Sequence, residues 1–271
     1  MNRAFSRTLG AVWLCRSVLG WLLALPFVAA VADSGVGGLF DGDRVLFEPG
    51  GLFLAELGRV SGPLLNGAAA TMWPYVLAAF ALRTLPQGAL FQQTFAPSSG
   101  PRKAFGAASA RVVPLVTIAA VELLAKVALV GIVVFVEQAA HAEPARRFGL
   151  LPAAALLGAG LFATTALADV RRGLLFVDPE LEGAALGPAL SHVRTNVLPL
   201  LGGYALRVGL GMLAVAVAAR LVEWIDVGRP GGWRVLAAFA LHQLVLGLVT
   251  ALDAFWIRRV VSPLQPPASF L

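Results

Sequence analysis

Three ionisable side chains lie deep inside long apolar stretches of this sequence. Glu122 and Lys126 belong to the apolar run 113–136, and Arg207 belongs to the run 197–219. A charge in such a position is costly, so it marks either a ligand or proton site or an ion pair between helices. These three residues are therefore the first candidates for a functional site.

The spacing of these residues suggests how their charges are matched. Glu122 precedes Lys126 by four residues, which is the favourable order for an ion pair on one helix face. At 1.5 Å per residue, Glu122 lies roughly 13 Å and Arg207 roughly 15 Å from the starts of their runs, whereas Asp253 lies only about 6 Å from the end of the run 235–257. We therefore expect Glu122, rather than Asp253, to be the partner of Arg207.

Together these residues could form a polar site with net positive charge, made of Glu122, Lys126 and Arg207 with His242 and Gln243 nearby. Such a site would hold a phosphate or carboxylate headgroup or relay protons. The alternative is a salt-bridge network that only fixes helix packing, since buried ion pairs often specify an arrangement without chemistry. We favour this structural alternative, and for His242 a hydrogen bond between helices.

Motifs of known enzymes are absent from the sequence. It contains no G-x-S-x-G turn, no H-E-x-x-H helix and no G-x-x-x-x-G-K-[ST] loop. His141, His192 and His242 fall in separate segments, and the single Cys15 excludes an intrachain disulfide or a cysteine cluster. We therefore expect no metal and no cofactor, and we favour a non-enzymatic protein over an enzyme.

The composition indicates the environment of the chain. Of its 271 residues, 58% are hydrophobic and 13% are charged, and the mean hydropathy is +0.81. This leaves too little polar surface to cover a water-soluble globule. The net charge of +6 comes from basic residues scattered at the ends of apolar runs, which is not the pattern of a nucleic-acid-binding protein.

The apolar runs predict an all-α, polytopic transmembrane bundle with about six spans in a single domain. Most Lys and Arg residues between the runs fall on the side that holds both termini, so we place the N- and C-termini in the cytoplasm of a bacterium, with the protein in its inner membrane. The predicted spans, each long enough to cross about 30 Å of hydrocarbon, are 12–31, 64–82, 113–136, 150–168, 197–219 and 235–257.

An alternative concerns the N-terminus. Ala30-Val31-Ala32 has the small-x-small form of a signal peptidase site, so residues 1–32 could be a cleaved signal peptide, which would leave five spans. At the other end, the three prolines of 262–271 prevent the last helix from continuing, and we expect a disordered tail there.

Two segments resemble each other and read as short elbow helices at the membrane surface. The stretches 104–115 and 185–200 each combine an amphipathic pattern with an arginine and then a proline. Pro114 and Pro199 are 85 residues apart, and the same offset carries Thr165-Ala166-Leu167 onto Thr250-Ala251-Leu252. The pattern indicates a duplicated helical hairpin, although short matches are common in a chain this rich in alanine and leucine.

Two arginine pairs follow the fourth and sixth predicted spans. Arg171 and Arg172 follow 150–168, and Arg258 and Arg259 follow 235–257. Basic residues at the cytoplasmic ends of spans contact anionic lipid headgroups, and we expect these four arginines to do so.

This layout resembles a group of bacterial and archaeal six-span membrane proteins that includes the membrane domain of some glycerophosphodiester phosphodiesterases. The resemblance rests on the elbow helices, on Asp169-Val170-Arg171-Arg172 and on the elbow 186-LGPALSHVRTNVLPLL-201. It implies a fold of six spans over nearly the whole chain. The phosphodiesterase domain has no counterpart here, so the resemblance implies no activity.

Three functions follow from these observations, in descending order. The first is a non-enzymatic inner-membrane protein that serves as a membrane partner or permease-like subunit, in contact with the bilayer and with other membrane proteins or a second copy of itself. The second is a small transporter or lipid-handling protein with an anion or headgroup site at mid-membrane. The third is an intramembrane enzyme.

Overall fold

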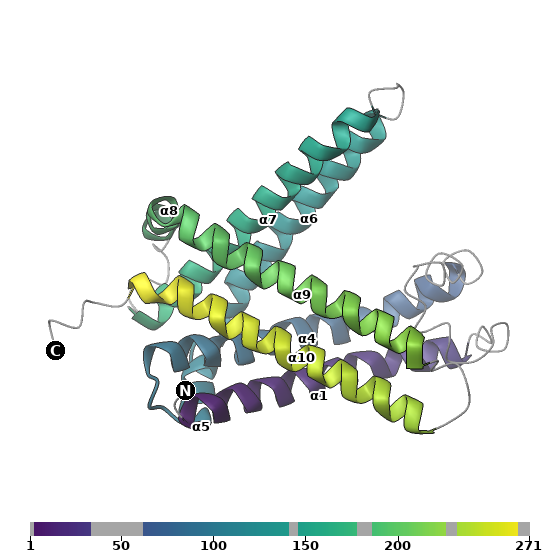
Figure 1. Ribbon diagram of the computed structural model, residues 1–271, viewed down its shortest axis with the longest axis horizontal. Helices are drawn as coiled ribbons and strands as arrows, with labels where there is room; N and C mark the ends of the chain where they lie inside the picture. Colours follow the sequence, from purple (N-terminus) through teal and green to yellow (C-terminus); the bar gives the residue numbers. More distant parts are fainter. Residues whose placement is uncertain (1–2, 34–61, 141–145, 178–185, 226–231, 265–271) are drawn as a thin grey trace, which may run out of the picture. The chain divides into compact units, whose positions relative to one another are not determined.

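The chain is helical throughout the part that the structure describes. The computed structural model describes residues 3–33, 62–140, 146–177, 186–225 and 232–264, and every regular element in these ranges is a helix (Figure 1). The prediction of an all-α protein is confirmed for this part of the chain. The helices are α1 (Arg3–Asp33), α4 (Gly62–Phe95), α5 (Pro101–Ser109), α6 (Val112–Ala140), α7 (Arg146–Val177), α8 (Leu186–Thr195), α9 (Val197–Ile225), α10 (Gly232–Val261) and the short 3₁₀ helix η3 (Ser262–Leu264).

Six of these helices are much longer than is usual in soluble proteins. α1, α4, α6, α7, α9 and α10 contain 29 to 34 residues each. At 1.5 Å per residue this gives roughly 44–51 Å, more than the hydrocarbon thickness of a bilayer. Among the described residues, three segments are both long and apolar enough to cross a membrane: Val112–Val133, Val197–Val222 and Leu236–Leu264.

A short helix lies at each place where we expected an elbow. α5 and α8 come before α6 and α9, which begin at Val112 and Val197. Pro114 and Pro199 are the third residues of these long helices. A proline is tolerated there because the first backbone N–H groups of a helix have no acceptor within it. Each predicted elbow therefore divides into a short helix and the first turn of the next long one.

The offset of 85 residues also relates buried positions. Ala104 and Ala189, in the two short helices, are both 0% exposed. Leu115 and Leu200, in the first turns of the two long helices, are both 1% exposed. The segments that begin with α5 and α8 thus repeat the same order of helices and the same inward-facing positions, which favours the interpretation as a duplication.

The described helices belong to two compact units. The first unit comprises residues 1–8, 87–206 and 254–271, and the second comprises 9–86 and 207–253. Within the first unit, α6 and α7 run side by side as a hairpin (Figure 1).

Aromatic rings form the core of the first unit. Tyr204 of α9 meets Phe162 of α7 and Trp256 of α10 edge to face, with ring centroids 5.5 and 5.8 Å apart. Phe91 of α4 stacks on Phe176 of α7 at 6.3 Å. Trp256 and Phe91 are 1% and 0% exposed. Large rings in these geometries favour close packing, so α4, α7, α9 and α10 all contribute to one apolar core.

In the second unit, α1 packs against α10. The indole Nε1 of Trp13 donates to the backbone oxygen of Gln243 at 3.2 Å, and the Ser17 hydroxyl donates to Oε1 of the same glutamine at 2.8 Å. One turn further along α10, Gly247 lies against the Trp13 ring, where an added Cβ would meet the ring at 3.9 Å. These contacts fix the register of the two helices.

The last described residues extend α10. Ser262–Leu264 form η3 directly after Val261, and residues 265–271 of the predicted tail lie outside the described part of the chain. His141 lies outside it as well.

Close packing in the first unit generates a prediction. A Cβ added at Gly88 of α4 would lie 2.8 Å from Leu115 Cδ1 and 3.0 Å from Ala108 Cβ, whereas one added at Gly106 of α5 would meet nothing within 4 Å. We expect Gly88→Ala to lower the melting temperature of the detergent-solubilised protein, by the equivalent of about 1–3 kcal/mol of overpacking.

Gly106→Ala is the matched control. It should leave the melting temperature unchanged or raise it, since alanine favours a helix over glycine by about 1 kcal/mol. A Gly88→Ala protein that melts at or above the wild-type temperature would contradict the packing of α4 on α5 and α6.

Candidate functional site

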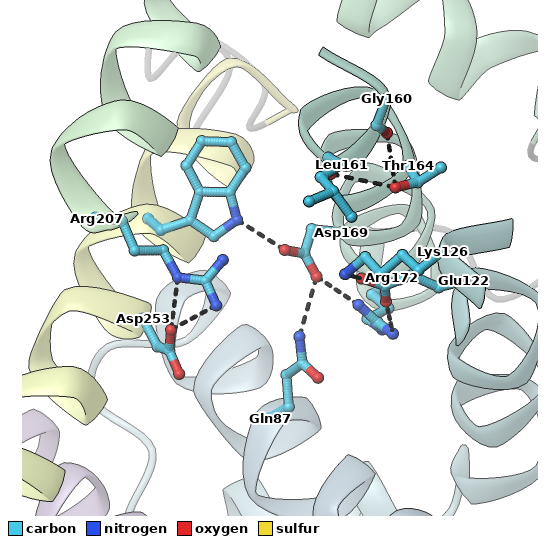
Figure 2. A network of polar contacts seen from close by, with 11 residues as sticks. Gln87, Glu122, Lys126, Gly160, Leu161, Thr164, Asp169, Arg172, Arg207 and Asp253 are labelled. Carbon is cyan, nitrogen blue, oxygen red and sulfur yellow. Dashed lines mark hydrogen bonds and ion pairs between the residues drawn. The ribbon is translucent and has the colours of Figure 1, made fainter. Parts of the chain in front are cut away.

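A buried carboxylate, Asp169 of α7, lies at the centre of a polar network in the first unit. Its Oδ1 accepts hydrogen bonds from Arg172 Nη1 at 2.6 Å and from Gln87 Nε2 at 3.0 Å, and its Oδ2 accepts one from Trp256 Nε1 at 2.7 Å (Figure 2). Asp169 is 1% exposed. A carboxylate with three donors is well compensated for the loss of water, and here the donors come from α4, α7 and α10.

The network continues through Arg172 to α6. Arg172 Nη2 binds Glu122 Oε2 at 2.6 Å, and Lys126 Nζ donates to the other oxygen of Glu122. The side chains of Arg172, Glu122 and Lys126 are 4%, 12% and 31% exposed, so the network runs from a fully buried end toward a partly accessible one. We call Gln87, Glu122, Lys126, Asp169, Arg172 and Trp256 the Asp169 network.

The charges of the Asp169 network cancel. Two carboxylates, Glu122 and Asp169, face two cations, Lys126 and Arg172, and each carboxylate oxygen has a donor. A neutral and hydrogen-bonded set of this kind can stay buried without a ligand. Its geometry therefore fits the role of holding α4, α6, α7 and α10 together.

A second network lies in the second unit, around Asp253 of α10. Arg207 of α9 binds Asp253 Oδ1 through Nε and Nη2, both at 2.7 Å (Figure 2). Arg16 of α1 binds the other oxygen, Oδ2, through Nη1 at 2.7 Å, and the same Nη1 donates to the hydroxyl of Thr250 at 3.2 Å. We call Arg16, Arg207, Thr250 and Asp253 the Asp253 network.

Burial in the Asp253 network is uneven. Thr250 is 0% exposed and its hydroxyl donates to the Leu246 backbone oxygen at 2.8 Å. The side chains of Asp253, Arg16 and Arg207 are 10%, 13% and 25% exposed, so Arg207 has the most accessible surface. Two cations share one carboxylate, and the network carries one net positive charge.

The offset of 85 residues relates the two networks in sequence. It carries Glu122 of α6 onto Arg207 of α9, and it carries Ala168 of α7 onto Asp253 of α10. Each hairpin thus has an ion pair between its two long helices, and the signs of the charges are exchanged. In α6–α7 the first helix supplies the acid, and in α9–α10 it supplies the base.

The expected pairing of Arg207 with Glu122 is wrong. Arg207 binds Asp253, and Glu122 binds Lys126 and Arg172. The error came from the end of the last span, which we placed at 257, whereas α10 continues to Val261. With eight residues beyond it, Asp253 lies about 12 Å from the end of its helix, close to the depth of Arg207 in α9.

The other members of the expected polar site have separate surroundings. Gln243 contacts Trp13 and Ser17 of α1, and the side chain of His242 is exposed. The described contacts therefore place Glu122 and Lys126 in the Asp169 network and Arg207 in the Asp253 network. Ligand binding by these five residues stays a prediction.

Of the four arginines that we expected at lipid headgroups, Arg172 lies elsewhere. Arg258 and Arg259, in the last turn of α10, are exposed and Arg171 is half-buried, but Arg172 is 3% exposed and binds two carboxylates. The reason is that α7 does not end at 168, as predicted, but continues to Val177. Asp169 precedes Arg172 by three residues in this helix, so both side chains lie on the same inward face.

Four members of the two networks, Asp169, Gln87, Trp256 and Arg16, were not among the predicted site residues. Asp169 and Arg172 are three residues apart, which is a signal of an intrahelical pair that was available in the sequence. The bonds from Gln87 and Trp256, which come from helices distant in sequence, left no such signal.

His192 of α8 is half-buried. Burial lowers the pKa of His192, and its hydrogen bond to the backbone of Val260 acts in the opposite direction. Within the described residues, no three side chains of His, Cys, Asp or Glu gather in a way that could hold a metal ion.

Comparison with known proteins found no matching family model, no matching curated protein and no matching solved structure. The resemblance to six-span membrane proteins stays a prediction.

The different burial of the two cations on Glu122 leads to a test of the Asp169 network. Arg172→Gln leaves Asp169 and Glu122 buried with less compensation, and we expect the protein to lose about 3–5 kcal/mol of stability. Lys126→Gln leaves Glu122 paired with Arg172, so its loss of stability should be clearly smaller than that of Arg172→Gln. Chemical denaturation in detergent, followed by circular dichroism, compares the two variants. Equal losses would show that Arg172 does not hold the network together.

Proposed function

We propose that this chain is a non-enzymatic multi-pass protein of a bacterial inner membrane, with six spans and both termini in the cytoplasm, which serves as the membrane-embedded partner or permease-like subunit of other proteins. The proposal is carried by one observation: the charged side chains of the Asp169 and Asp253 networks bind each other. In the Asp169 network each carboxylate oxygen has a donor from the chain, which leaves no ionised acid free to act as a base.

The surface of the long helices supports a role in the membrane. Apart from Leu200 and Gly203 near its start, no residue of the candidate span Val197–Val222 of α9 is buried within the chain. Met212 and Leu213 of α9, and Leu124 of α6, are 69%, 59% and 68% exposed. Helices that are apolar on their exposed faces need lipid or a partner protein to cover them.

The distribution of basic residues supports the orientation. Arg102 and Lys103 in α5, Arg194 in α8 and Arg258 in α10 are exposed, and all four belong to segments that we assign to the cytoplasmic side. Basic residues are retained on that side during insertion and attract anionic headgroups there.

Labelling of single cysteines tests the spans and their orientation. In a Cys15→Ser background, a membrane-impermeant thiol reagent should label Trp224→Cys, at the far end of α9, in intact cells. It should label Arg102→Cys only after the cells are opened, and Leu213→Cys in neither case. Labelling of Arg102→Cys in intact cells would show that the orientation is the opposite of the proposed one. Labelling of Leu213→Cys would show that α9 does not span the bilayer.

Photo-crosslinking tests the role as a subunit. A diazirine amino acid at Met212 in α9 should yield one protein adduct of constant mass in native membranes, and no protein adduct when the purified chain is reconstituted in lipid alone. The same probe at Leu175, which is 2% exposed, is the matched control and should yield no adduct with another protein. Adducts with lipid only, at Met212 and at Leu213, would rule out a partner on this face.

A further inference from the structure

The Asp253 network has one more cation than charge neutrality requires. Arg207 alone would neutralise Asp253 and join α9 to α10, and Arg16 alone would neutralise it and join α1 to α10. Both arginines are present, and Asp253 is the one described acid that binds either of them. The two ion pairs join α1 and α9 to α10, and together they leave one positive charge that Asp253 does not neutralise.

The Asp169 network provides a comparison within the same molecule. It also joins two long helices through an ion pair, and Glu122 occupies the position that corresponds to Arg207. There the acids and bases are equal in number. A duplicated hairpin can thus be joined by a neutral set of charges, which makes the imbalance around Asp253 a specific feature of the second network.

The surroundings of the surplus charge are apolar. Val208 and Leu210 flank Arg207 on α9 and are 37% and 39% exposed, and Leu14 and Val18 flank Arg16 on α1 and are 58% and 48% exposed. Arg207 lies within the candidate span Val197–Val222. An uncompensated guanidinium in such surroundings is costly unless an anion reaches it.

The N–H groups of the two arginines that Asp253 does not use indicate which class of anion fits the site. Asp253 accepts from Nη1 of Arg16 and from Nε and Nη2 of Arg207. Nε and Nη2 of Arg16 and Nη1 of Arg207 have no acceptor among the described residues. Guanidinium N–H groups bind the oxygens of phosphate in pairs, with a geometry that favours phosphate over a spherical anion.

We propose that Arg16 and Arg207, whose combined charge exceeds that of Asp253 by one, bind one phosphate group of single negative charge. A phosphodiester of an anionic lipid and free inorganic phosphate share this chemistry. The charge of the site matches such a group, and Arg207, the most accessible member of the network, is the contact through which it enters. This site goes beyond the proposed role as a subunit and does not require a protein partner.

Thermal unfolding of the purified protein in nanodiscs tests the proposal. One arm compares nanodiscs of phosphatidylcholine with nanodiscs that also contain phosphatidylglycerol, and the other adds inorganic phosphate to nanodiscs of phosphatidylcholine. We expect the wild-type protein to melt at a higher temperature in one arm. A rise with phosphatidylglycerol assigns the site to a lipid headgroup, and a rise with inorganic phosphate assigns it to a free anion.

Two variants change the charge of the site in opposite directions. Arg207→Gln removes the surplus charge and should weaken the apparent affinity for the phosphate group by about tenfold, as expected for the loss of one charged hydrogen-bonding partner. Asp253→Asn adds to the surplus positive charge and should strengthen the apparent affinity for the phosphate group. Both variants are expected to melt below the wild type without ligand, so the readout is the rise in melting temperature that the ligand produces.

Arg258→Gln is the matched control, since it removes an exposed arginine of the same helix. It should respond to phosphate or phosphatidylglycerol as the wild type does. An equal loss of response in Arg258→Gln and Arg207→Gln would assign the effect to overall positive charge and overturn the proposal. A response that falls in both Arg207→Gln and Asp253→Asn, or a wild type that responds to neither ligand, would overturn it as well.

Discussion

A charged side chain inside an apolar helix must find an opposite charge within reach, because hydrocarbon offers no water to solvate it. This constraint determines which helices of the chain must approach each other. Asp169 of α7 draws its donors from α4, α7 and α10, and Asp253 of α10 draws its donors from α1 and α9. Breaking either set leaves a buried charge without a partner, at a cost of about 3–5 kcal/mol of stability. A shift of one helix along another exchanges apolar contacts for similar ones and costs less.

The two hairpins meet this constraint with opposite charges. Corresponding positions hold Glu122 in α6 and Arg207 in α9, while the elbows, the initial prolines and the buried positions of the two segments agree. Exchange of the charges has a physical consequence: an α6-type helix does not match an α10-type helix, because both present an acid. Ion pairs of this polarity therefore disfavour a contact between α6 and α10 at these positions.

Apolar packing complements the ion pairs. The side chains of Phe91, Phe162, Tyr204 and Trp256 form the core of the first unit, and the indole N–H of Trp256 also binds Asp169. An indole has an apolar body and one polar edge, so it can join the core to the polar network without leaving a buried donor unpaired. In this chain a single residue connects both kinds of stabilisation.

The sequence by itself determined the helical class, the positions of the elbows and the presence of charges inside apolar runs. These features depend on local composition and spacing: long apolar runs favour helices that can cross a membrane, and prolines at 114 and 199 mark where long helices start. The Glu122–Lys126 pair was also predicted, since residues four apart on one helix are always neighbours.

Only the tertiary structure decided which charges meet across helices. Arg207 binds Asp253 and Arg172 joins Glu122 to Asp169, because helices that extend beyond their apolar runs bring these side chains to similar depths. Hydropathy does not show where a helix ends when its last residues are polar. The rotation of each helix about its own axis depends on the helices packed against it. The partners of Arg16, Gln87 and Trp256 were set by packing over long distances in sequence, which no local pattern records.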